Sequence, residues 1–173
     1  MAVVIKKLGF ENITIYNGGL KDWIKTGKPV ETIDPLPTYD GGFISADELN
    51  QEISSAGNKR CVDDKGAPHL TLIDFRSSLK LSEKKGSDKY RIKTNCRTIT
   101  VLLDDFINNQ KLIDSIPREG LVVTISETGN RDHYLMRYLK KFDYTNIRGL
   151  QFGMRAWLKA DYPVEMVDRS LER

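Results

Sequence analysis

The six-residue loop Ser126-Glu127-Thr128-Gly129-Asn130-Arg131 is the part of the sequence whose residue types and spacing best suit chemistry. It follows an apolar run at Leu121–Ile125 and leads into a helical pattern at Arg131–Phe142. A tight, glycine-containing turn at a helix N-terminus directs backbone N–H groups inward, and the helix dipole favours an anion there. Arg131 could add a bidentate clamp at the end of the loop. The spacing indicates an anion site, and a plain strand-to-helix turn without a ligand fits it equally well.

Few other residues are of the types that bind metals or act as nucleophiles. The two cysteines, Cys61 and Cys96, make no disulfide framework, and with His69 and His133 they do not supply the spaced ligand set of a zinc site. A role for Cys96 in inert packing is favoured over a role as a sulfur acceptor. The sequence predicts no metal and no cofactor.

The loop must be positioned by alternating strands and helices, which extend from residue 43 to residue 165. This alternation predicts an α/β sandwich around a mostly parallel sheet of about five strands, with helices on both faces. Ligands of such sheets bind beyond the carboxyl ends of the strands, where this loop lies. The expected helices cover residues 46–54, 102–116, 131–142 and 154–160, and the expected strands cover 70–75, 98–102, 121–125 and 146–150.

One segment of the chain is repeated at a fixed offset of 134 residues. Residues 2–31 align with residues 136–165 without a gap, and ten of the thirty pairs are identical, where ordinary residue frequencies would give roughly two. The shared residues include Trp23 and Trp157, and both copies end in Pro-Val-Glu. Only the second copy is preceded by a full series of alternating strands and helices. The predicted organisation is a C-terminal remnant of a preceding repeat at 1–31, a linker at 32–42, a complete domain at 43–165 and a tail at 166–173.

Composition narrows the class of protein. The net charge of +3 is too small an excess to indicate a nucleic-acid partner. No apolar stretch reaches the roughly 18 residues of a membrane span, and the first seven residues lack the order of a signal peptide. We expect a soluble protein without a membrane partner, and the sequence leaves a cytoplasmic or a periplasmic location open.

In this order along the chain, the motifs resemble those of the rhodanese family of sulfurtransferases, in which tandem domains are common. Leu72-Ile73-Asp74-Phe75-Arg76 is similar to the family's I-D-x-R strand, and Thr128-Gly129-Asn130-Arg131 to the T-G-N-R of its active loop. The closing motif G-x-x-x-W occurs at Gly19–Trp23 and again at Gly153–Trp157. The resemblance implies a rhodanese-like three-layer sandwich for residues 43–165.

The resemblance also implies roles for individual residues. Ser126, at the position of the family's cysteine, and Arg131 take the catalytic positions. Asp74 and Arg76 take supporting ones. The anion-binding part of the loop consists of Glu127, Thr128, Gly129 and Asn130.

The activity implied by the resemblance is sulfane-sulfur transfer from a thiosulfate-type donor to cyanide or a protein thiol. In the family, a loop cysteine with a lowered pKa attacks sulfur and holds it as a persulfide. The implied partners are therefore a small sulfur-containing anion or a persulfide donor, and a thiol protein. The loop has the sulfurtransferase length, one residue shorter than that of the related phosphatases.

Three departures from the family pattern affect this expectation. Ser126 cannot hold a persulfide, Glu127 would repel an anionic donor, and Tyr90–Asn95 lacks the histidine and both glycines of the family's G-H-I-x-G-A stretch. We therefore expect a domain that is weak or inactive in sulfur transfer. The alternatives are a non-catalytic interaction or regulatory module, and an active enzyme whose loop cysteine was deliberately replaced.

Two further segments bear on partners. The basic stretch from Lys80 to Arg97 could steer anions, although a solvated polar loop is the favoured interpretation. The N-terminal remnant carries apolar residues without a sheet of its own, and we expect it to pack on the complete domain or on a second chain, which would give a homodimer. These residues are Val3, Val4, Ile5, Leu8, Ile13, Ile15 and Trp23.

Overall fold

The computed structural model describes residues 9, 11–31, 35–56, 61–62, 66–76 and 90–166. The chain divides into two compact units, residues 1–35 and residues 36–173, which are called the first and the second unit below. Several residues with sequence-based expectations lie outside the described ranges, namely residues 2–8, the basic residues between 80 and 89, and the tail from 167.

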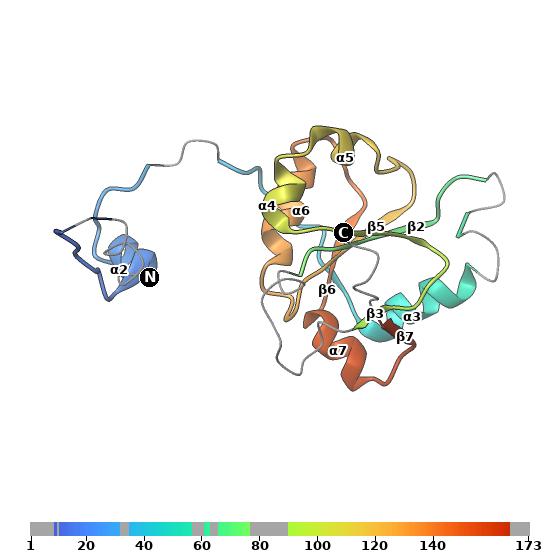
Figure 1. Cartoon of the computed structure of the whole chain (residues 1–173). Helices are drawn as coiled ribbons and strands as arrows, with labels where there is room; N and C mark the ends of the chain where they lie inside the picture. Colours follow the sequence, from blue (N-terminus) through green and yellow to red (C-terminus); the bar gives the residue numbers. More distant parts are fainter. Residues whose placement is uncertain are drawn as a thin grey trace. The chain divides into compact units, whose positions relative to one another are not determined.

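The second unit is built on a five-stranded sheet with the strand order β1-β6-β5-β2-β4 (Figure 1). All four strand pairs in this sheet are parallel. A separate antiparallel pair joins β3 to β7. The strands are β1 (Phe43–Ile44), β2 (Leu70–Asp74), β3 (Tyr90–Ile92), β4 (Arg97–Thr100), β5 (Leu121–Ile125), β6 (Ile147–Leu150) and β7 (Val164–Met166).

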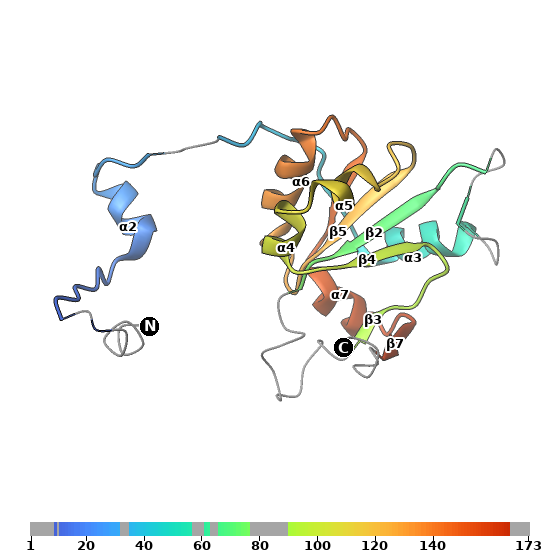
Figure 2. The ribbon, with the colours of Figure 1, turned by 45° about the horizontal axis from the view of Figure 1, so that its top comes forward.

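Helices cover both faces of this sheet (Figure 2). On one face lie α3 (Ala46–Ser55) and α7 (Gly153–Lys159). On the other face lie α4 (Leu103–Ile107), α5 (Gln110–Asp114) and α6 (Asp132–Lys140). Side chains alternate along a strand, so Val123 of β5 packs under α3 and α7 whereas its neighbour Val122 packs under α4 to α6. The predicted fold class, a three-layer α/β sandwich on a mostly parallel sheet, is confirmed.

The prediction of one helix over residues 102–116 is wrong. Two short helices, α4 and α5, occupy this range. The side chain of Asn109 accepts a hydrogen bond from the Leu112 N–H at 3.1 Å, which caps the first turn of α5. Asparagine side chains favour such caps over helix interiors. The spacing of the apolar residues alone does not indicate that the helix is interrupted here.

The interpretation of Cys96 as a cysteine in inert packing is also wrong. Cys61 and Cys96 form a disulfide bond with an S–S distance of 2.00 Å. Cys61 precedes β2 and Cys96 precedes β4, and these two strands are parallel neighbours in the sheet. Because parallel neighbours begin at the same edge, the pairing that brings the strands together also brings the cysteines together. Neither sulfur is a free thiol that could accept sulfane sulfur.

The first unit holds one described helix, α2 (Gly19–Lys25), followed by a turn at Gly27. The indole N–H of Trp23 donates to the Pro29 carbonyl at 2.9 Å and fixes the chain after the helix. No residue of α2 is buried. Across the described residues of both units, no helix is long and apolar enough to cross a membrane.

Candidate functional site

The loop at residues 126–131 joins the carboxyl end of β5 to the start of α6, near the middle of the sheet. It is held by α7, because the Met154 N–H donates to the Ser126 carbonyl at 2.9 Å and the Arg155 N–H donates to the Glu127 carbonyl at 3.3 Å. Gly153 makes this contact possible. A Cβ at that position would lie 2.3 Å from the Ser126 carbonyl oxygen. The loop and the start of α7 therefore form one rigid assembly.

The predicted loop residues divide into an interior and an exterior group. Ser126, 3% exposed, and Gly129 are buried inside the loop. Glu127 is half-buried and forms an ion pair with Arg155 at 3.1 Å. Arg131 is exposed, and its guanidinium carbon lies 5.9 Å from the centre of the Phe75 ring. The exterior therefore carries one negative and one positive side chain, and the interior carries a hydroxyl group.

The two supporting residues form a buried ion pair at the end of β2. Arg76 donates from Nε to Asp74 Oδ1 at 2.8 Å and from Nη2 to Asp74 Oδ2 at 2.6 Å. The same Nη2 also donates to the Tyr90 carbonyl at 2.6 Å. The pair thus joins β2 to the start of β3, and a bidentate geometry of this kind resists rotation. This edge of the site is structurally fixed.

A buried carboxylate that sequence reasoning missed lies directly against the loop. Asp132, the first residue of α6, is 0% exposed. Its Oδ1 accepts a hydrogen bond from the Thr124 hydroxyl at 2.7 Å, and its Oδ2 accepts one from the Ser126 hydroxyl. Ser126 Oγ in turn accepts from the Gly129 N–H at 3.0 Å. The Gly129 N–H therefore donates to the serine oxygen, and the serine hydroxyl donates to the carboxylate.

Burial raises the pKa of Asp132 to about 6, although the hydrogen bonds from Ser126 and Thr124 act in the opposite direction. At neutral pH the carboxylate is consequently ionised in most molecules. A buried negative charge then touches the side chain at the nucleophile position. A second anion on that side chain would be strongly disfavoured, because like charges at contact distance raise each other's pKa.

The signal for Asp132 was present in the sequence in a weak form. An acidic residue in the first turn of a helix is ordinarily explained by the helix dipole alone. The polar Thr124 inside the apolar strand β5 supplies one hydroxyl for the carboxylate. Gly149 of β6 supplies the space, since a Cβ there would lie 2.8 Å from Asp132 Cβ. Both features become interpretable only once β5, β6 and α6 are placed together.

A small hollow of about 260 Å³ adjoins the loop on the side of β1 and β6. Three aromatic rings and three neutral polar side chains line it, together with Gly129. Phe43 and His133 meet edge to face with ring centres 4.8 Å apart. The lining residues are Phe43, Thr128, Gly129, Asn130, His133, Gln151 and Phe152. Sequence reasoning had selected three of them, Thr128, Gly129 and Asn130, as part of the loop.

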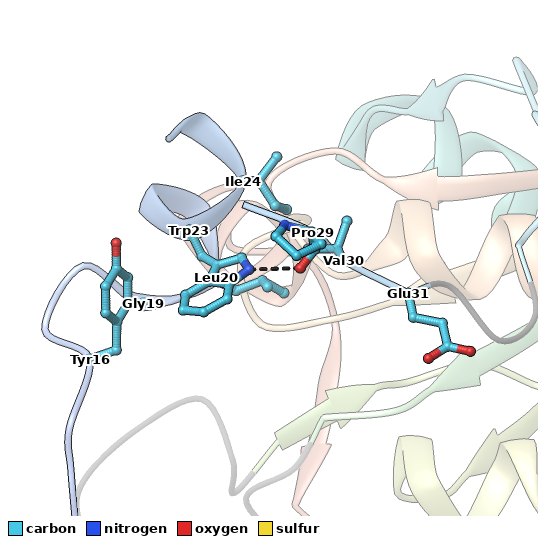
Figure 3. A pocket seen from close by; sticks show the side chains of 8 residues that line it. All are labelled: Tyr16, Gly19, Leu20, Trp23, Ile24, Pro29, Val30 and Glu31. Atoms are coloured by element: carbon cyan, nitrogen blue, oxygen red, sulfur yellow. Dashed lines mark hydrogen bonds between the residues drawn. The ribbon is translucent and has the colours of Figure 1, made fainter. Parts of the chain in front are cut away.

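A larger hollow of about 560 Å³ lies in the first unit, beside α2. Figure 3 shows the Trp23 indole directed at the Pro29 carbonyl, with the aliphatic side chains of Leu20, Ile24 and Val30 around it. All three aliphatic side chains are exposed. The hollow is mostly apolar and contains none of the predicted site residues.

Solved structures with the same fold include rhodanese-like domains. The rhodanese-like domain of the Alr3790 protein from Anabaena sp. matches with a TM-score of 0.52 and 14% identity, over 75% of this chain and 82% of that chain. The SSP1007 protein from Staphylococcus saprophyticus matches with a TM-score of 0.50 and 17% identity, over 72% of this chain and 98% of that chain.

The BH2092 protein from Bacillus halodurans matches with a TM-score of 0.50 and 13% identity, over 87% of this chain and 85% of that chain. No protein-family model matches the chain, and no curated protein matches it in sequence. At these identities the likeness concerns the fold. The second unit has the fold of rhodanese-like domains.

Proposed function

We propose that the second unit is a rhodanese-like domain of sulfurtransferase type that has lost sulfur transfer and acts as a non-catalytic binding module. The observation that carries this proposal is the hydrogen bond from Ser126 to the buried carboxylate of Asp132. Its two partners remove the two properties that sulfur transfer requires of this position: the serine replaces the thiolate, and the carboxylate opposes an electropositive surrounding.

The first property is the nucleophile itself. Sulfur transfer forms an S–S bond between a thiolate and a sulfane sulfur, and the donor leaves with the electron pair of the bond that breaks. A serine hydroxyl has no accessible anion at neutral pH and cannot form that bond. The Ser126 hydroxyl instead donates a hydrogen bond to Asp132, so its oxygen serves as a structural link between the loop and α6.

The second property is the electrostatic environment. A cysteine persulfide is an anion, and a loop that holds one needs N–H donors and no negative charge nearby. Here the Gly129 N–H still donates to the side chain at the nucleophile position, but Asp132 adds a negative charge at contact distance. Glu127 adds a second acidic side chain to the loop, where it pairs with Arg155. The buried charge of Asp132 therefore repels an anionic donor.

The proposal is tested by restoring the two properties one at a time. We compare the wild-type chain, Ser126→Cys, and the double variant Ser126→Cys/Asp132→Ser in a thiosulfate:cyanide assay, with the added mass of one sulfur atom measured on each protein. We expect no turnover and no added sulfur in the first two proteins, and both in the double variant. Full turnover of Ser126→Cys alone would overturn the proposal and favour an active enzyme with a replaced cysteine.

The thiol pKa provides a second measurement on the same variants. Cys61 and Cys96 are joined in a disulfide, so the thiol introduced by Ser126→Cys would be the single one that iodoacetamide alkylates under non-reducing conditions. Beside the ionised Asp132 its pKa should exceed the ordinary value of about 8.5, and without that carboxylate it should fall below it. Asp132→Ser alone, with Ser126 retained, is the matched control for folding.

A further inference from the structure

The hollow beside the loop at residues 126–131 has the size and chemistry of a pocket for one apolar side chain. Its volume of about 260 Å³ is below the roughly 300–1,000 Å³ of pockets that enclose whole small molecules. Its lining includes the aromatic rings of Phe43, His133 and Phe152 and the amides of Asn130 and Gln151. None of its lining residues is a lysine, arginine or carboxylate, so the chemistry selects a neutral occupant.

Phe152 is the least expected residue of this hollow. Its backbone is left-handed, with φ at 58°, a conformation that bulky residues rarely adopt. Its side chain is 68% exposed, so folding gains little from its burial. Gly18 occupies the aligned position before α2, with a right-handed backbone at φ −68°, and the helix there begins at the equivalent residue. The helix therefore requires neither an aromatic residue nor a left-handed backbone at this place.

The hollow also adjoins the terminal strand of the sheet. β1 is the terminal strand of the five-stranded sheet. The Gly42 carbonyl accepts a hydrogen bond from the Gly149 N–H of β6, and the Ile44 carbonyl accepts one from the N–H of Gln151, the residue after β6. Because backbone groups alternate in direction along a strand, the N–H and C=O of Phe43 point away from β6. Among the described residues, neither of these two main-chain groups has a hydrogen-bond partner, and both lie beside the hollow that the Phe43 ring lines.

We propose that an extended segment of a partner polypeptide pairs with Phe43 at this edge and inserts one aromatic or aliphatic side chain into the hollow. This mode, strand addition with a side-chain pocket, takes affinity from main-chain hydrogen bonds and specificity from the pocket. The inference rests on the proposed function of a binding module and names the partner of that module. The short edge of β1 limits it to a weak, local contact.

The test is an NMR titration of the ¹⁵N-labelled full chain with three blocked tripeptides, acetyl-Ala-Phe-Ala-amide, acetyl-Ala-Asp-Ala-amide and acetyl-Ala-Lys-Ala-amide. We expect the Phe peptide alone to shift the amides around the hollow, with a dissociation constant in the millimolar range. These amides belong to Phe43, Gly129, Asn130, Gln151 and Phe152. Equal binding of the charged peptides, or shifts located elsewhere, would overturn the proposal.

Two variants separate recognition from folding. Phe152→Gly suits the left-handed backbone, so its urea midpoint should equal or exceed that of the wild type while its affinity for the Phe peptide falls at least about fivefold. Tyr134→Ala is the matched control, because Tyr134 is an exposed aromatic residue of α6 outside the hollow. It should bind the peptide as the wild type does. Undiminished binding by Phe152→Gly would contradict the assignment.

A peptide methylated at the Phe nitrogen tests the strand pairing, since it cannot donate to the Phe43 carbonyl. It should bind more weakly than its parent, and equal binding would refute pairing at this edge. If the same amides shifted with protein concentration in the absence of peptide, the partner at this edge would be a second copy of this chain. If the wild-type chain takes up no sulfur and binds no peptide, only this inference is overturned. If the wild-type chain takes up sulfur, the proposed function itself is overturned.

Discussion

The two closing segments, α2 with its following turn and α7 with its following turn, have the same local structure. Their bounds, Gly19–Lys25 and Gly153–Lys159, differ by the 134 residues that separate the aligned sequences. Each first glycine has φ at +62°. The Trp23 indole donates to the Pro29 carbonyl at 2.9 Å, and the Trp157 indole donates to the Pro163 carbonyl at 3.1 Å.

The two helices differ in burial, because the apolar side chains of α7 are buried and those of α2 are exposed. Met154 and Trp157 are 0% exposed and pack among the buried residues beneath α3 and α7. In α2, Leu20 is 69% and Ile24 is 53% exposed. The helix, its turn and the tryptophan hydrogen bond are therefore specified by the local sequence, and burial is supplied by the sheet and α3. Coverage of α2 by the second unit or by a second copy stays a prediction.

The largest expected difference between the two segments is the effect of removing each tryptophan. Trp157→Ala should lower the free energy of unfolding of the second unit by about 3–5 kcal/mol, because it leaves a large cavity in a fully buried place. Trp23→Ala should lower it by less than about 0.5 kcal/mol, the usual range for surface substitutions. Urea unfolding followed by far-ultraviolet circular dichroism measures both.

This comparison also tests what covers α2. If Trp23→Ala destabilised the second unit as much as Trp157→Ala does, the apolar face of α2 would be packed on that unit. A destabilisation that depends on protein concentration would instead place a second chain there. Leu20→Ala offers a second variant on the same exposed face, with the tryptophan fluorescence retained.

A second difference is that the second unit contains a buried carboxylate. The pKa of Asp132, about 6 in the folded chain, lies above its ordinary value of 3.8. Between these two values the folded state holds a proton that the unfolded state has lost. The stability that this proton provides is complete below pH 4 and is lost as the pH rises to 6, at a total cost of about 3 kcal/mol.

Asp132→Asn should remove this dependence. Relative to the wild type, its free energy of unfolding should rise by about 3 kcal/mol between pH 4 and pH 7. A Trp23→Phe background leaves Trp157 as the single tryptophan, so that fluorescence reports the second unit alone. Parallel pH profiles of the Asp132→Asn variant and of the chain that retains Asp132 would show that the carboxylate is not the titrating group.

The sequence was informative wherever a feature is encoded locally. The helix expected from residue 46 begins there as α3, where the capping box of Ser45 and Glu48 makes hydrogen bonds of 2.8 and 3.1 Å. The buried strand β5 has the predicted bounds. The loop after it lies where the rules for parallel sheets place it. These features depend on residues within a few positions of each other.

Features that join distant residues could not be predicted. The disulfide between Cys61 and Cys96 depends on which strands are neighbours, and their separation of 35 residues gives no indication of it. Asp132 and the aromatic wall at Phe152 depend on the approach of β6 to the loop. The short strands β1, β3 and β7 have too few residues for an alternating pattern to be recognised.

The smallest expected effect concerns the turn that follows each helix. Gly27 has φ at 69° and its aligned residue Asp161 has φ at 55°, so both turns need a left-handed residue. Asp161→Gly should stabilise the second unit by about 0.5 kcal/mol, because glycine adopts this conformation readily and its greater freedom in the unfolded chain offsets part of the gain.

The reciprocal variant, Gly27→Asp, should loosen the turn after α2 without affecting the urea midpoint of the second unit. The measurement is the amide exchange of Lys28, whose N–H donates to the Trp23 carbonyl at 3.2 Å, beside that of Tyr162, whose N–H donates to the Trp157 carbonyl at 3.4 Å. We expect faster exchange at Lys28 and unchanged exchange at Tyr162. Equal protection of both amides in the wild type would imply that α2 is as well buried as α7, because exchange from a turn of the same geometry then depends on packing alone.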